Sequence, residues 1–193
     1  MSKSDVDQKI IAAFAKLAGI YGYKGTTTRK IAQEAGINES TIFRHFTDKK
    51  GILRSLIMQY TNEITKVSHD FTLTGNSEKD IQRVVSIYQY FIEQHKGIFL
   101  IALRENRQFP ELMEAIGQLI TLQRNLYTKL FEKMHQHGEI ADNINIAVEV
   151  NNFLLLNFGH SVFKLAYSGP NFQISDQDYL TKNIKVFTSH LRN

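Results

Sequence analysis

The chain has 193 residues, of which 42% are hydrophobic and 22% charged, the balance of a folded globular protein that can bury a core. It has no cysteine, which excludes disulfides, thiolate metal sites and cysteine nucleophiles and suits a reducing compartment, so we expect a cytoplasmic protein. The sequence contains neither an export signal nor a run of about 18 apolar residues, so we expect no membrane span.

The net charge of +4 is concentrated toward the N-terminus. Residues 1–54 hold 10 Lys and Arg against 5 Asp and Glu, whereas residues 55–193 hold 13 against 14. A polyanion would therefore be attracted to the first segment rather than to the rest of the chain.

The first predicted helix covers residues 5–21, where apolar side chains recur at helical spacing, and Gly22 and Gly25 are expected to end it. Residues 26–46, TTTRKIAQEAGINESTIFRHF, then predict two short helices. These helices and the start of the next are expected to close around an apolar core of Phe14, Leu17, Ile31, Ile42, Phe46 and Leu53.

Local signals set the limits of the two short helices. Thr26 or Thr27 can cap the first, and Gly36 supplies a left-handed turn after it. Asn38 is the predicted cap of the second helix, residues 39–45, which is too short to be stable alone. A capped helix, a glycine turn and a short polar helix are typical of the helix-turn-helix motif, although an ordinary helical hairpin shares the pattern.

The next segments continue as helices. Asp48 can cap a long helix that reaches about residue 67, and residues 72–77 predict a loop. Ser77 is the expected cap of a helix over residues 78–95.

The middle of the chain predicts two further helices. Gly97 is expected to separate the preceding helix from a shorter one over residues 98–106. Pro110 has no N–H to lose at a helix start, so it can begin a long helix that Gly138 ends. With no strand pattern anywhere, we expect an all-α fold of about nine helices, divided into residues 1–50 and 51–193.

The C-terminal part is unusually apolar. Residues 144–166 carry hydrophobic side chains on more than one face, which predicts burial on several sides. A last helix is expected at residues 176–191. The surplus apolar surface of these two helices predicts self-association.

The N-terminal pattern resembles the signature of the tetracycline-repressor (TetR) family of transcriptional regulators. The matching positions are Ala13, Phe14, Leu17, Gly22, Thr28, Ile31, Ala32, Ala35, Gly36, Thr41, Phe43, His45, Phe46, Lys49 and Leu53. The resemblance implies a helix-turn-helix domain, a larger domain that binds a small-molecule inducer, and a homodimer formed by the helices at about 144–166 and 176–191. It also implies repression at a palindromic operator on double-stranded DNA.

The position of each polar residue in the motif predicts its role on DNA. Thr28 and Arg29 begin the first helix and are expected at a phosphate. Arg44 can pair with guanine, and Glu39 can accept from cytosine or simply complement the helix dipole. The remaining predicted DNA-binding residues are Ser40, Thr41, Phe43, His45 and Lys49. His45 and Lys49 are expected at phosphates. Phe43 replaces the tyrosine usual in the family and so lacks a hydroxyl for a phosphate.

Polar and aromatic residues within apolar helices are the candidates for binding an inducer, which we expect to be lipophilic. They are Tyr60, Tyr88, Arg104, Tyr127, Asn151, Asn152 and His160, although for each single residue a structural role is favoured over ligand contact. We expect no cofactor, metal site or enzymatic activity, because no nucleophile, phosphate-loop or paired-carboxylate pattern is present. An architectural DNA-binding protein without a ligand is the alternative interpretation.

Overall fold

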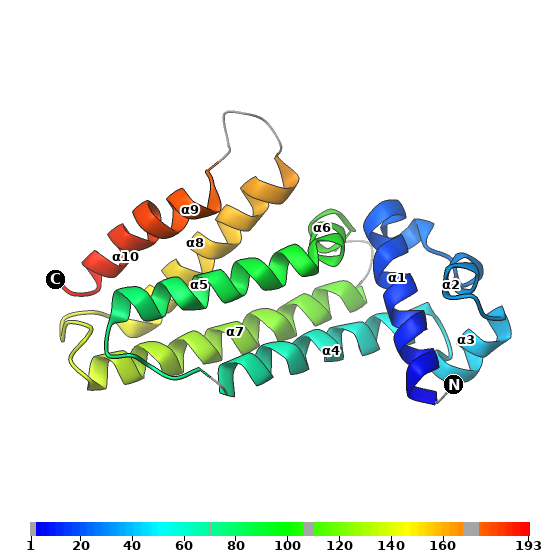
Figure 1. Cartoon of the computed structure of the whole chain (residues 1–193), viewed down its shortest axis with the longest axis horizontal. Helices are drawn as coiled ribbons and strands as arrows, with labels where there is room; N and C mark the ends of the chain where they lie inside the picture. The colour runs from blue at the N-terminus through cyan, green and yellow to red at the C-terminus, as the bar shows by residue number, and fades with distance from the viewer. Residues whose placement is uncertain (1–2, 70, 106–109, 168–173) are drawn as a thin grey trace. The chain divides into compact units, whose positions relative to one another are not determined.

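The structure is a computed structural model that describes residues 3–69, 71–105, 110–167 and 174–193. Within these ranges every regular element is helical (Figure 1). The C-terminal segments α9, η3 and α10 run continuously, so the described part of the chain has nine helices, as predicted. None of the described helices is both long enough and apolar enough to cross a membrane.

The chain divides into two compact units, each described here by itself. The first holds residues 1–67 and 95–119, and the second holds residues 68–94 and 120–193. The predicted boundary between residues 50 and 51 falls within a helix of the first unit, and the division into residues 1–50 and 51–193 stays a prediction. The first four helices are α1 (Lys3–Gly25), α2 (Thr28–Ala35), α3 (Glu39–Phe46) and α4 (Lys49–His69). The others are α5 (Ser77–Gln94), α6 (Lys96–Glu105), α7 (Pro110–Gln136), α8 (Ile146–Ala166), α9 (Asp176–Asp178), η3 (Tyr179–Asn183) and α10 (Ile184–His190).

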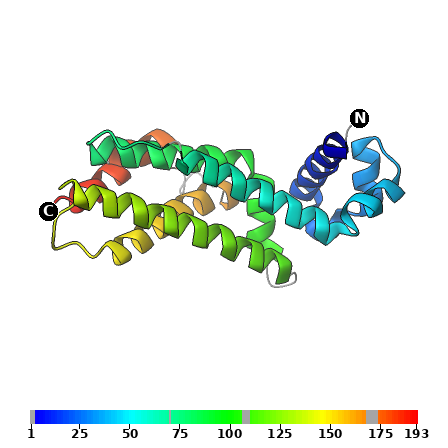
Figure 2. The ribbon, with the colours of Figure 1, turned by 90° about the horizontal axis from the view of Figure 1, so that it is seen from below.

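The core of the first unit forms where α1, α2 and α3 pack together. Figures 1 and 2 show these three helices gathered in one cluster from two directions. The predicted core residues Phe14, Leu17, Ile31, Ile42 and Leu53 are buried, which confirms the helical faces assigned to them. The remaining one, Phe46, is half-buried.

The prediction that Gly97 separates two helices is wrong. Gly97 is the second residue of α6, and the break comes two residues earlier, at His95. The glycine is required because α6 crosses α1 there: a Cβ added to Gly97 would lie 2.9 Å from the Cα of Gly19. Two glycines that face each other allow the backbones to approach more closely than side chains would permit.

The second unit has its own apolar core from α5, α7, α8 and the C-terminal helix. Ile81, Phe131, Phe153 and Ile184 are fully buried in it. The predicted cap of α5 is wrong by one residue, because Asn76 Oδ1 accepts from the backbone N–H of Lys79 at 3.0 Å.

Helix α8 is only partly covered within one chain. Leu155 is 69% exposed, and Val148, Phe158 and Phe163 are also exposed. On α10, Val186 is 72% exposed. The prediction that residues 144–166 are buried on several sides is therefore not met by the single chain.

Candidate DNA-binding site

The ends of α2 and α3 are fixed by local hydrogen bonds, as the sequence predicted. Thr27 accepts from the backbone N–H of Lys30 at 3.3 Å, whereas the hydroxyl of Thr26 is buried and donates to the carbonyl of Gly22 at 2.8 Å. Gly36 adopts the left-handed conformation with φ 67° and ψ 37°. Asn38 accepts from the N–H of Ser40 at 2.9 Å. The angle between the two helices is thus set by caps and a glycine turn.

Helix α3 has one buried and one exposed face. Ile42 is fully buried against the cluster, which orients the helix. Ser40 and Arg44 are exposed, and Phe43 is 51% exposed. Arg29, at the start of α2, is also exposed.

Glu39 and Thr28 form a contact that the sequence did not indicate. The Thr28 hydroxyl donates to the carboxylate of Glu39 at 2.6 Å, joining the first turns of α2 and α3. A threonine hydroxyl has a single proton to donate, so in this geometry it is not available to a phosphate. At the start of α2 the N–H of Lys30 already donates to Thr27, so a phosphate there would be bound by the first two N–H groups of the helix, those of Thr28 and Arg29.

His45 and Lys49 also bind partners within the first unit. The Nδ1 of His45 contacts the carboxylate of Asp7 on α1, and the imidazole side chain is only 8% exposed. The Nζ of Lys49 donates to the carbonyl of Tyr23 at 2.7 Å and lies 4.1 Å from the centre of the Tyr23 ring. These bonds hold the motif against α1.

Asp7 and Tyr23 were missed because they lie 38 and 26 residues from their partners, and no pattern in the sequence joins them. The predicted phosphate contact of His45 would require its ring to leave Asp7.

The candidate inducer residues do not form a single group. Tyr60 belongs to the first unit, where its ring lies 3.7 Å from that of His95 and burial raises the pKa of its hydroxyl. Tyr88 and Tyr127 are buried in the second unit. Asn151 and Asn152 are exposed on α8. The side chain of Arg104 lies outside the described residues.

A polar cluster inside the second unit surrounds Tyr88. Burial raises the pKa of Tyr88 to about 12, an effect partly opposed by its hydrogen bond with Ser161. The hydroxyl of Tyr179 donates to Asn157 at 3.2 Å, and the imidazole of His160 stacks on the Tyr179 ring at 3.9 Å. The sequence had indicated only Tyr88 and His160 among these. No group of three or more His, Asp or Glu side chains in the described ranges is placed to hold a metal ion.

Comparison with known proteins agrees with this geometry. The model of the family "Bacterial regulatory proteins, tetR family" matches residues 10–56, which contain α2 and α3. A helix-turn-helix transcriptional regulator of Bacillus subtilis, YvkB, is 26% identical over 159 residues, 82% of each chain. A fatty acid metabolism regulator of the same organism is 24% identical over 140 residues, 72% of each chain.

A solved structure shows the same fold over nearly the whole length. It is that of the transcriptional regulator FadR from Bacillus subtilis in complex with stearoyl-CoA. The TM-score is 0.73 and the sequence identity 16%, with 94% of this chain and 97% of that chain covered. The helical arrangement is therefore shared well beyond the N-terminal motif.

Proposed function

The chain belongs to the TetR family of helix-turn-helix transcriptional regulators, and from this premise we propose that it is a cytoplasmic repressor. In this proposal it binds a palindromic operator as a homodimer and is released by a lipophilic ligand that contains an acyl chain. The observation that carries the DNA-binding part is the exposed face of α3, where Ser40, Phe43 and Arg44 project from a helix that Ile42 anchors.

The contacts within the motif support a division of roles. Arg44 is exposed and reads a base edge, for which a guanidinium matches the two acceptors of guanine. Arg29 and Lys49 bind phosphates. The contacts of Glu39 with Thr28 and of His45 with Asp7 favour positioning roles, in which these residues fix the angle of α3 rather than touch DNA.

The exposed apolar side chains of α8 and α10 support the homodimer. Leu155 and Val186 are the most exposed of them, and burying apolar surface contributes about 25 cal/mol per Å². Two copies that cover these faces would carry two copies of α3. In such a dimer we expect the two recognition helices to lie about 34 to 36 Å apart, one turn of the DNA.

Two of the comparisons support an acyl ligand. One is a fatty acid metabolism regulator, and a fold neighbour was solved with stearoyl-CoA. The apolar core of the second unit, with Tyr88 and Tyr127 as buried polar groups, has the composition of a site for a largely hydrophobic ligand.

Two measurements test the proposal in sequence. Genomic fragments that the purified protein retains are sequenced, and we expect an inverted repeat among them; retention of all fragments alike would contradict an operator. The labelled repeat is then titrated with acyl-CoA of increasing chain length while fluorescence anisotropy is followed. We expect release by long chains and none by coenzyme A alone, and release by no chain length would contradict the acyl ligand.

A further inference from the structure

Phe43 is the apolar member of the exposed face of α3. Ser40, Phe43 and Arg44 are spaced so that they project from one side of this helix. Phe43 is 51% exposed, whereas its neighbour Ile42 is fully buried. The face that the proposed function places on DNA therefore carries an aromatic ring beside a guanidinium.

The backbone that carries the ring is held by the end of the helix. The carbonyl of Phe43 accepts from the N–H of Thr47 at 3.1 Å, and the carbonyl of Phe46 accepts from the N–H of Asp48 at 2.6 Å. Thr47, between these bonds, has φ 64° and ends α3. A phenylalanine on a fixed helix moves about only two side-chain torsions, so its ring loses little conformational entropy when it is ordered on a partner.

Polar groups next to the ring are used within the first unit. The hydroxyl of Ser40 donates to Asn38 Oδ1 at 2.9 Å, and the carboxylate of Glu39 accepts from the hydroxyl of Thr28 at 2.6 Å. A serine hydroxyl has one proton, so in this geometry Ser40 can only accept from DNA. Base reading by this face therefore depends mainly on Arg44 and on the ring of its neighbour.

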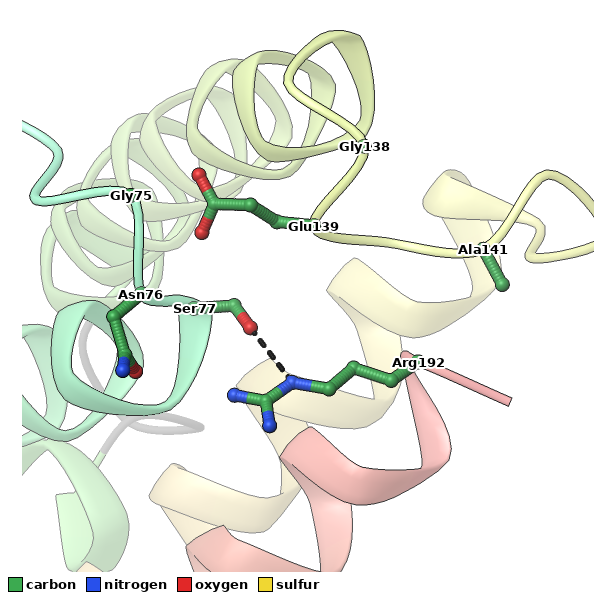
Figure 3. Close-up of a pocket in the computed structure, with 7 residues that line it drawn as sticks. All are labelled: Gly75, Asn76, Ser77, Gly138, Glu139, Ala141 and Arg192. Carbon is green, nitrogen blue, oxygen red and sulfur yellow. Dashed lines mark hydrogen bonds between the residues drawn. The ribbon is translucent and has the colours of Figure 1, made fainter.

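The second unit contains an arginine in the opposite situation. Arg192 lines a cavity of about 460 Å³, and Figure 3 shows it reaching the start of α5. Its Nε donates to the hydroxyl of Ser77 at 3.1 Å, and its Nη2 lies 3.9 Å from Glu78. This guanidinium ties the C-terminal end of the chain to α5, whereas Arg44 is exposed to a partner.

A phenyl ring distinguishes base pairs by a single group. The ring has no hydrogen-bond donor or acceptor, so contact with an N–H or C=O of a base edge would remove water from that group without replacing its hydrogen bond. In the major groove the apolar group is the C5-methyl of thymine. Contact between the ring and this methyl group buries apolar surface on both sides.

We propose that Phe43 makes the protein select thymine, by packing its ring on the C5-methyl group next to the guanine that Arg44 reads. Consecutive Cα atoms are about 3.8 Å apart and consecutive base pairs about 3.4 Å, so the thymine lies within about two base pairs of that guanine. This inference rests on the proposed function and adds a base that α3 selects without a hydrogen bond.

Replacing thymine by uracil in the operator tests the contact, because it removes only the C5-methyl group. Each thymine of the inverted repeat selected from genomic fragments is replaced in turn, and the affinity of the full-length protein is measured by fluorescence anisotropy. We expect a uracil close to a guanine in the half-site to weaken binding about fourfold, the equivalent of about 0.8 kcal/mol for one buried methyl-sized group. If no uracil weakens binding, the proposal is overturned.

The variant Phe43→Ala tests the residue. The matched control is Tyr90→Ala, at an aromatic residue of α5 that is 65% exposed. We expect Phe43→Ala to bind the thymine and uracil operators equally, while the control keeps the preference for thymine. A preference that persists in Phe43→Ala would assign the methyl contact to another residue and refute the proposal.

The experiment separates failure of this inference from failure of the proposed function. If the protein retains all genomic fragments alike, operator binding fails and the thymine contact fails with it. If the protein selects a repeat but binds its thymine and uracil forms equally, operator binding stands and only the role of Phe43 is refuted.

Discussion

Replacing Gly97 by alanine tests how tightly α6 and α1 are packed. The added Cβ would lie 2.9 Å from the Cα of Gly19, 3.5 Å from its N and 3.6 Å from the carbonyl oxygen of Ala15. Carbon atoms pack best at about 3.5 to 4.0 Å, so the helices must separate. Overpacking of this kind costs about 1 to 3 kcal/mol, against which alanine gains about 0.8 to 1.0 kcal/mol in helix propensity. We expect a net loss of about 0 to 2 kcal/mol.

Two further alanine variants calibrate this loss. At Gly19 the new Cβ would lie 3.2 Å from the Cα of Gly97, a less severe contact. At Gly117, on α7, no atom lies within 4 Å of the new Cβ, so only the gain in propensity of about 1 kcal/mol remains. The expected order of stability is Gly117→Ala, then Gly19→Ala, then Gly97→Ala.

The assay is thermal unfolding followed by circular dichroism. For a chain of this size 1 kcal/mol changes the midpoint by about 2 to 4 °C, so the difference of about 1 to 3 kcal/mol between Gly97→Ala and Gly117→Ala is measurable. If the two variants unfold at the same temperature, the close approach of α1 and α6 does not limit stability, and the reason given for a glycine at position 97 is wrong.

Three other outcomes are expected. Arg44→Ala should lower the affinity for the operator by about 1 to 3 kcal/mol and leave the affinity for random DNA unchanged. Lys49→Ala should weaken binding to both DNAs alike and lower the slope of log affinity against log salt concentration by about 1. Equal losses from Arg44→Ala on both DNAs would contradict base recognition. Leu155→Glu should give a monomeric mass in light scattering. The control Met58→Glu, at a site of similar exposure on α4, should leave the dimer intact. A dimeric Leu155→Glu protein would exclude α8 from the interface. Burial raises the pKa of Asp176, but hydrogen bonds from Lys164 and His160 outweigh it and hold this pKa below its usual range. The stabilisation that ionised Asp176 gives the folded protein is therefore complete at pH values above the pKa of the unfolded state, about 3.9. It is lost as the pH falls through the lower pKa of the folded state. Asp176→Asn should accordingly lower the free energy of unfolding at pH 7 but leave it unchanged at the lowest pH of a denaturation series. An equal loss at pH 7 and at the lowest pH would contradict this linkage.

The helix limits of the motif were predictable because their causes are local. Thr27, Gly36 and Asn38 each act on backbone groups within five residues, and such contacts can be inferred from residue type and spacing. The same holds for the buried face of α3, since helical periodicity alone places Ile42 inward.

Glycine shows where local inference fails. Gly36 and Gly97 are the same residue type, yet one ends a helix and the other lies inside one. The difference is the presence of Gly19, 78 positions earlier in the chain, on a helix that crosses α6. Similarly, Asn76 and Ser77 are both good caps, and only the backbone path decides between them.

By itself, the sequence determined the all-helical fold, the helix-turn-helix motif and the basic N-terminal segment, because periodicity, caps and charge are properties of neighbouring residues. Only the tertiary structure decided which polar side chains are already engaged. It brought Thr28 to Glu39 and His45 to Asp7. These contacts depend on how helices cross, which is set by packing over the whole unit rather than by any short stretch of the chain.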